Sequence, residues 1–344
     1  MTADLPDQAH AGALRYVARS STDLVAIVPV VLGFHPRDSV VLLTFGAPGG
    51  AFHARVDLPV GVAEQEEVAD VLVGAVSANR VERVAVLLYS DDVEVAHSQA
   101  TMLLGRLLDR HVEVIDVIRV DDGHWHVLPE DGSPGTAYDL EGHPFTAQGV
   151  FEGHVVHRDR AELADTLVGT DETDAVEVAL AATRFADLVA SSGEEGLLRT
   201  EARWLQQFLR SPLTVAVRPA DAGRLLVLAS IVATRDVAWS EISRDSSGDH
   251  VELWRGLVRR SPRHLLPGAC SLLAFAAWQH GDGALAWCAI DRCLEVDPDY
   301  SMAHCVARIL TGAVPPSVWE PIREDELPVF AEVTARGQDG SRAS

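Results

Sequence analysis

The sequence predicts an α/β protein in which a mixed, mostly parallel α/β sheet is followed by an all-helical C-terminal domain. Three apolar, β-branched runs, at 40–45, 81–89 and 112–120, are typical of strands buried on both faces. Helical stripes at 62–79 and 95–110 alternate with these runs, which indicates right-handed parallel crossovers. Farther along the chain, alanine, leucine and valine dominate and strand-like alternation is missing, so this part is predicted to be helical.

One predicted strand pair is antiparallel. The first apolar run is followed by a glycine-rich turn and by an alternating segment at 51–57, an arrangement typical of a hairpin. Paired residue numbers keep a constant sum in an antiparallel register. If Phe45 faces Ala51, then Ser39 faces Asp57, and the start of the first strand meets the end of the second.

The remaining elements follow from caps, stripes and turns. A helix is expected from residue 24, after an N-cap among residues 21–23, with a kink at Pro29 and an end at Gly33. A short helix is expected at 11–18. A short edge strand is expected at 124–128, with further helices at 145–153, 158–167, 171–191, 194–209, 219–234, 249–261, 265–280, 283–296 and 301–311.

The segment 129–142 is rich in glycine, proline and acidic residues and is the predicted domain boundary. It divides the chain into a sheet domain at 1–135 and a helical domain at 136–334. A disordered tail is expected at 335–344.

Polar side chains are expected to gather at one edge of the sheet, where the parallel strands end. Ligands of open α/β sheets tend to bind beyond the carboxyl ends of the strands. Carboxylates this close together need a cation, so an arginine should contact one of them. The candidate ligand-binding residues are His35, Arg37, Asp38, Ser39, Arg55, Asp57 and Asp91.

Other interpretations of this edge stay open. The polar groups could only cap turns and form surface ion pairs, or the carboxylates could hold a hard cation such as Mg²⁺. A nucleophile triad at Ser39 lacks the strained Gly-x-Ser-x-Gly elbow. His124 and His126 share one face of the expected edge strand, where exposed polarity accounts for them. The chain contains neither G-x-G-x-x-G nor a P-loop, so the sequence gives no indication of which cofactor, if any, the protein binds.

Charge and composition restrict the partners. The chain has 28 basic and 51 acidic residues, a net charge of −23, and a hydrophobic content of 47% that excludes a largely disordered protein. An acidic surface repels phosphates, so we expect no nucleic-acid and no membrane partner.

A cytoplasmic location is expected because the N-terminus lacks a signal-peptide pattern and the apolar run at 24–34 is too short to span a bilayer. Four cysteines in helical sequence fit core packing in a reducing compartment.

Several segments resemble one known family. LGFHPRDSVVLL, ARVDLP, LLAFAAWQHGDGALAWCAIDRCLEVDP and VPPSVWE resemble the actinobacterial family DUF4192, a domain of unknown function. The resemblance implies a mostly soluble bacterial protein and transfers no catalytic residue. Many members have a cysteine-rich segment after Gly-x-Trp, whereas residues 123–132 contain no cysteine here. The segment 265–312 also resembles a tetratricopeptide (TPR) helix pair.

Three functions are compatible with these patterns. The favoured one is a non-enzymatic binding or regulatory protein, with a ligand at the polar edge and a protein partner on the helical domain. The first alternative is a metal-assisted hydrolase that uses the carboxylates and His35. The second is a structural homo-oligomer with the polar edge as its subunit interface.

Overall fold

A computed structural model describes most of the chain, in two compact units. The described residues are 3–4, 16–48, 52–130, 132, 134–192, 195–213 and 217–330. The first, which we call the sheet unit, comprises Met1–Leu167, Gly281–Cys288 and His304–Val318, and the second, the helical unit, comprises Val168–His280, Ala289–Ala303 and Trp319–Ser344. The expected tail at 335–344 lies outside the described residues, and the boundary expected after residue 135 stays a prediction.

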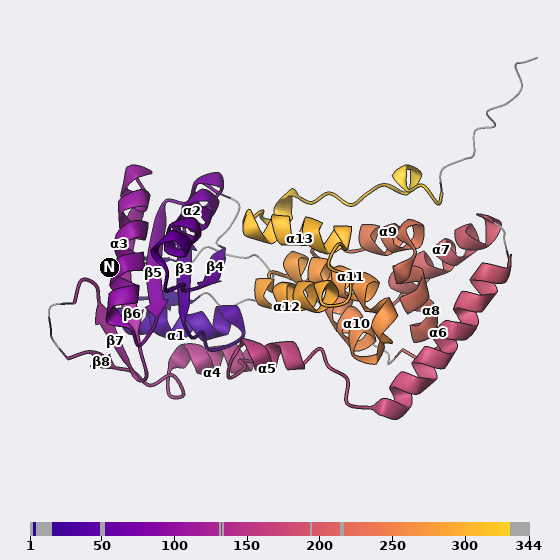
Figure 1. Ribbon diagram of the computed structural model, residues 1–344, viewed down its shortest axis with the longest axis horizontal. Coiled ribbons are helices and arrows are strands. Elements are labelled where there is room, and N and C mark those ends of the chain that lie inside the picture. Colours follow the sequence, from indigo (N-terminus) through magenta and orange to yellow (C-terminus); the bar gives the residue numbers. More distant parts are fainter. Residues whose placement is uncertain are drawn as a thin grey trace, which may run out of the picture. The chain divides into compact units, whose positions relative to one another are not determined.

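The sheet unit is built on a six-stranded sheet with the strand order β4-β3-β5-β6-β7-β8 (Figure 1). Every strand predicted from the sequence is confirmed, and within this sheet the short strand β8 is the one that was not expected. The strands are β3 (Ser39–Phe45), β4 (His53–Asp57), β5 (Arg83–Tyr89), β6 (Glu113–Val120), β7 (His124–Val127) and β8 (Thr136–Ala137).

The prediction of a mostly parallel sheet is wrong. Only β5 and β6 pair in parallel, and every other neighbouring pair is antiparallel. The reason is that β3 lies between β4 and β5, so these two strands, which run in the same direction, do not pair with each other. The turn at Gly123, with φ +86°, then adds β7 as a hairpin partner of β6. Because β4, β5 and β6 still run in one direction, their carboxyl ends share one edge of the sheet.

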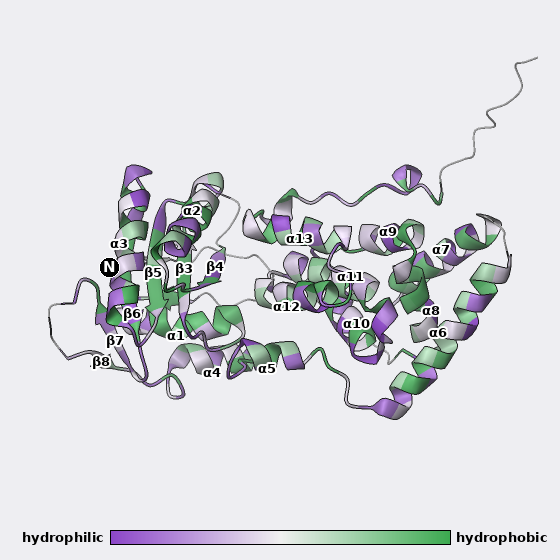
Figure 2. Cartoon of the chain, viewed as in Figure 1, coloured by the Kyte–Doolittle hydropathy of each residue, from purple (hydrophilic) through white to green (hydrophobic). Residues whose placement is uncertain are grey.

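Helices cover both faces of this sheet (Figure 1). The helices α2 (Val62–Ala78) and α3 (Val93–Asp109) form one core with alternate strand residues such as Val40, Leu42 and Val86. The strand residues between these point to the other face of the sheet, which α1 (Ser21–Leu32) covers. On that face Trp125 Nε1 donates a hydrogen bond to Thr22 Oγ1. Burial on both faces explains why most residues of β3 and β5 are hydrophobic, as Figure 2 shows.

The helix α1 begins earlier than predicted. Ser20 is its N-cap, and a capping box with Asp23 satisfies two backbone N–H groups, so the helix starts at Ser21. It continues through Pro29 and ends at Gly33, whose left-handed φ of 74° suits glycine. The short helix expected at 11–18 is wrong at its end, where β2 (Val17–Ala18) pairs with β1 (Ala3–Asp4), and residues 11–15 lie outside the described part.

The C-terminal half is helical, as predicted, with one difference. The single helix expected at 219–234 is two helices, because Ile231 adopts an extended conformation with ψ 117°. No described helix is long and apolar enough to span a bilayer. The helices are α4 (Pro144–Phe151), α5 (Arg160–Asp165), α6 (Glu172–Ser192), α7 (Glu195–Leu209), α8 (Pro219–Ser230), α9 (Val232–Ser240), α10 (Ser247–Arg260), α11 (Leu266–His280), α12 (Gly283–Leu294) and α13 (Ser301–Thr311).

A buried histidine makes the helical unit sensitive to acid. His250 is 1% exposed, its Nδ1 has no hydrogen-bond partner among the described residues, and burial lowers its pKa to about 4. The unfolded chain takes up this proton near pH 6.5, so protonation favours unfolding as the pH falls from about 6.5 towards 4. We expect this histidine to remove about 2 kcal/mol of unfolding free energy between pH 7 and pH 5.

Urea titrations at pH 7 and pH 5 test this expectation. His250→Gln should remove that part of the pH dependence, whereas His264→Gln, which changes an exposed histidine of the same unit, should retain it. An equal pH dependence in wild type and His250→Gln would contradict the prediction.

Candidate functional site

The strand pairing forms the polar edge that the sequence predicts, where β3 begins and β4 and β5 end. Ser39, the first residue of β3, pairs with Asp57 on one side and with Tyr89 on the other. The pairing of Ser39 with Asp57 confirms the register deduced from the hairpin. The starts of β3 and the ends of β4 and β5 therefore meet at one edge of the sheet.

Arg55 joins the residues of this edge. Its Nε donates a hydrogen bond of 2.9 Å to Ser39 Oγ, and its Nη2 lies 2.6 Å from Asp57 Oδ1. The guanidinium carbon lies 5.8 Å from the centre of the Phe34 ring. Ser39 Oγ in turn donates to the carbonyl oxygen of Arg37. The arginine is therefore held by groups of its own unit on both its polar and its aromatic sides.

Opposing influences act on the pKa of Arg55. Burial lowers the pKa of Arg55, the carboxylates of Asp57 and Asp38 act against this lowering, and the nearby cation Arg160 adds to it. Asp38 itself has a left-handed φ of 42°, and its carbonyl oxygen accepts a hydrogen bond of 2.7 Å from the Leu58 N–H. Asp38 thus closes the end of the hairpin through its backbone.

Two of the predicted residues lie apart from these contacts. His35 is anchored through its backbone, whose N–H donates to the carbonyl oxygen of His157, and burial together with Arg37 lowers the pKa of its ring. Asp91 is exposed beyond the end of β5, and no described contact joins it to Arg55 or Asp57. Across the described residues, no three His, Cys, Asp or Glu side chains gather closely enough to hold a metal ion.

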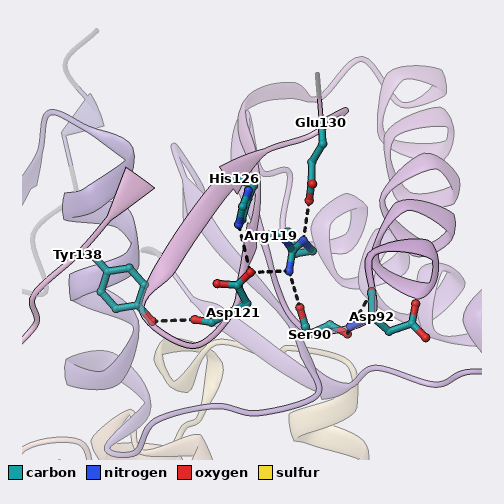
Figure 3. Close-up of polar contacts among 7 residues, drawn as sticks. All are labelled: Ser90, Asp92, Arg119, Asp121, His126, Glu130 and Tyr138. Carbon is teal, nitrogen blue, oxygen red and sulfur yellow. Dashed lines mark hydrogen bonds and ion pairs between the residues drawn. The ribbon is translucent and has the colours of Figure 1, made fainter. Parts of the chain in front are cut away.

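A second polar cluster lies at the same edge, on β6 and β7 (Figure 3). Arg119 is 4% exposed and makes three short contacts: Nε to Glu130 Oε1 at 2.6 Å, Nη1 to Asp121 Oδ2 at 2.9 Å, and Nη1 to the Ser90 carbonyl oxygen at 3.0 Å. Burial alone would lower the pKa of Arg119, but Glu130 and Asp121 raise it above its usual value. The arginine therefore stays charged and fixes both carboxylates.

Asp121 extends the cluster to an imidazole. Its Oδ2 lies 3.1 Å from His126 Nε2, and its backbone oxygen accepts a hydrogen bond of 3.3 Å from the Tyr138 hydroxyl (Figure 3). Gly135 packs against the same end of the His126 ring, where an added Cβ would lie 2.5 Å from His126 Cε1 and 2.6 Å from Nε2. The ring is thus held in one orientation, and the prediction that His126 is exposed edge polarity is wrong.

A pocket of about 300 Å³ adjoins this cluster. Its walls come from β7 and from the segment that follows it, and they combine apolar surface with the polar side chains of His126 and Glu130. The lining residues are Trp125, His126, Val127, Pro129, Glu130, Pro134, Gly135 and Thr136.

The two clusters lie on opposite faces of the sheet. Ser39 pairs with Tyr89, which pairs with Val120, and these residues share the face that α1 covers. Arg119 pairs with Leu88 and with His126, on the face that α2 and α3 cover. Since neighbouring residues of a strand point to opposite faces, the two groups cannot form one site.

The sequence contains a signal for the second cluster. Arg119 interrupts an otherwise apolar strand end, and a charged residue inside a buried strand needs partners. Asp121 follows it by two residues, and an acidic residue, Glu130, comes after the next strand. Nothing in the sequence fixes the distance between Arg119 and Glu130, because that depends on how the segment after β7 turns back.

Comparison with known proteins places the chain in a family. The chain belongs to the family described as Domain of unknown function (DUF4192), whose model matches residues 22–317. This result confirms the family resemblance of the sequence segments. No curated protein and no solved structure matches the chain.

Proposed function

We propose that this member of the family is a binding protein and that its sheet unit takes a small, amine-bearing ligand in the pocket beside β7. The observation that carries the proposal is the pocket of about 300 Å³ whose polar groups are already fixed in place. This volume is at the lower end of the range for small-molecule sites. Fixed polar groups favour binding because little conformational freedom is lost when the ligand arrives.

The chemistry of the lining supports an amine. Glu130 lines the pocket, and only one of its carboxylate oxygens, Oε1, bonds to Arg119. Among the described residues no hydrogen bond involves the second oxygen, Oε2, so it remains an acceptor for a ligand. Trp125 and Pro129 add apolar wall beside it, which suits a short carbon chain attached to the amino group.

The Ser39 cluster remains a prediction as a ligand site. Arg55 already bonds to Ser39 and Asp57, so a ligand anion would have to displace a contact of 2.6 Å. We therefore place the ligand at β7. The metal-assisted hydrolase has no supporting set of three ligands among the described residues.

Saturation-transfer NMR with putrescine, ethanolamine and arginine as separate probes tests the proposal. We expect at least one amine to receive magnetisation from the wild-type protein. Glu130→Gln should weaken that binding on the order of tenfold, because a charge-assisted hydrogen bond contributes about 1.5–3 kcal/mol. Glu82→Gln removes the same charge from an exposed position at the start of the first parallel strand and should leave binding unchanged.

Two results would contradict the proposed function. One is the absence of a signal for all three amines at millimolar concentration. The other is an equal response of wild type and Glu130→Gln, which would assign the signal to the general acidity of the protein, whose net charge is −23. Native mass spectrometry of the purified protein offers an independent check through any small molecule that stays bound.

The wider cellular setting also remains a proposal. The helical domain predicted at 136–334 would dock a protein partner, with a TPR-like helix pair at 265–312 as the expected surface. The acidic charge supports the absence of direct nucleic-acid and membrane partners, and the cytoplasmic location stays a prediction. A homo-oligomer built on the polar edge is the structural alternative, and sedimentation velocity distinguishes it from a monomer.

A further inference from the structure

The strand β4 ends the sheet and leaves one row of backbone groups unpaired. The Leu58 N–H donates to the Asp38 carbonyl oxygen, so residues 38 and 58 form a hydrogen-bonded pair. Such pairs alternate along an antiparallel ladder. Ala54 and Val56 therefore point their backbone groups towards β3, while residues 53, 55 and 57 point theirs outward. Within the described part of the chain, no backbone group pairs with this outer row.

A groove lies beside this edge, between β4 and α2, on the face opposite Arg55. It has a volume of about 360 Å³, and its floor is apolar. Val71 is 43% exposed there, although α2 buries most of its other large apolar side chains. The lining residues are Val56, Asp57, Pro59, Val68 and Val71, with Glu64 and Glu67.

The charges of the groove have one sign. All three charged lining residues, Asp57, Glu64 and Glu67, are acidic. The Asp57 side chain is 86% exposed, so most of its carboxylate is open to a partner. An occupant of this groove therefore needs apolar side chains for the floor and basic side chains for the rim.

We infer that this groove binds an extended segment of a partner protein in which apolar residues alternate with lysine or arginine. The segment adds to β4 as a further strand, and the outward groups of residues 53, 55 and 57 supply its main-chain hydrogen bonds. Side chains of an added strand alternate between the two faces. Its apolar residues enter the groove against Val68 and Val71, and its basic residues, which point to the opposite face, lie beside the exposed Asp57 carboxylate.

Protection against aggregation would explain the short, charged strand β4 but not the apolar groove beside it. Natural edge strands are often short and charged to prevent uncontrolled pairing, and β4 has five residues that include Arg55 and Asp57. That function requires no apolar groove beneath the edge. The inference is independent of the amine pocket, which lies at β7, separated from β4 by three strands in the sheet order.

Fluorescence anisotropy with a labelled peptide of alternating lysine and valine tests the inference on the full chain. We expect saturable binding of this peptide. A peptide of alternating glutamate and valine should not bind, because its carboxylates would lie beside Asp57 and in the negative field of Glu64 and Glu67. A peptide of the same lysine and valine content in two blocks should bind more weakly, because it cannot place apolar residues on one face.

Two pairs of variants separate the groove from general charge effects. Asp57→Pro removes an outward N–H and should weaken binding about fivefold more than Asp57→Ala, which removes only the carboxylate. Val71→Gln should weaken binding about tenfold, since it loses apolar contact in the groove. Leu108→Gln replaces another exposed apolar residue, on α3, and should have no effect.

Three outcomes would overturn the inference. The first is no binding of the alternating lysine–valine peptide at millimolar concentration. The second is binding that neither Val71→Gln nor Asp57→Pro weakens. The third is a wild-type dimer in sedimentation velocity that Asp57→Pro converts to monomer, which would assign the edge to a second copy of the chain.

Discussion

Replacement of Arg119 by alanine is expected to destabilise the sheet unit by about 3 kcal/mol or more, because it leaves two partly buried carboxylates without their cation. Arg119 is 4% exposed, and the side chains of Asp121 and Glu130 are 23% and 21% exposed. The Ser90 carbonyl oxygen loses a donor as well. Amide hydrogen exchange in β5 and β6 measures the effect, and the expected acceleration is on the order of a hundredfold.

Arg106→Ala is the matched control for this variant. Arg106 lies 2.6 Å from Asp70 in the same unit, but the two side chains are 31% and 74% exposed. An exposed ion pair of this kind contributes less than about 1 kcal/mol. If both variants changed exchange equally, burial would not be what makes the Arg119 cluster important, and the cluster would lose its role as a fixed wall of the pocket.

Local sequence patterns were sufficient to predict the five longest strands of the sheet and the register of the hairpin between β3 and β4. The hairpin between β3 and β4 is short, so the constant-sum rule places Ser39 beside Asp57 without knowledge of the rest of the fold. The same reasoning did not reveal which strand lies next to β5. That choice depends on pairing across a helix, and β3 takes the position that a simple β-α-β count assigns to β4.

The candidate site was harder to predict than the fold. Ser39, Arg55 and Asp57 were brought together by the register, whereas Asp91 was placed by the direction of its strand alone and makes no described contact with them. The pocket depends on Glu130 and Gly135, in a segment whose path follows from no periodicity. The burial of individual side chains could not be predicted either. The sequence pattern predicts an exposed His126, but in the fold Gly135 packs against its ring.

A methyl group added at Gly268 is expected to destabilise the helical unit by about 3 kcal/mol, at the upper end of the cost of overpacking. Gly268 lies in the first turn of α11, where an added Cβ would collide with the carbonyl oxygen of Ala229, at the end of α8. The obstructing atoms all belong to the backbone, so no side chain can turn away to make room. Two helices would have to separate instead.

Gly256→Ala adds the same methyl group to α10, where, apart from the adjoining residues and backbone of its own helix, no atom of the described residues lies within 4 Å of the new Cβ. Alanine is a better helix former than glycine, so this variant should gain about 0.5–1 kcal/mol. Thermal melts followed by circular dichroism at the helical band compare the two variants. We expect Gly268→Ala to melt about 6 °C or more below wild type and Gly256→Ala to melt slightly above it. Two substitutions of identical chemistry would then shift the melting temperature in opposite directions, because only Gly268 lies against a neighbouring backbone. Equal shifts would mean that the contact between Gly268 and Ala229 does not limit the packing of α8 and α11.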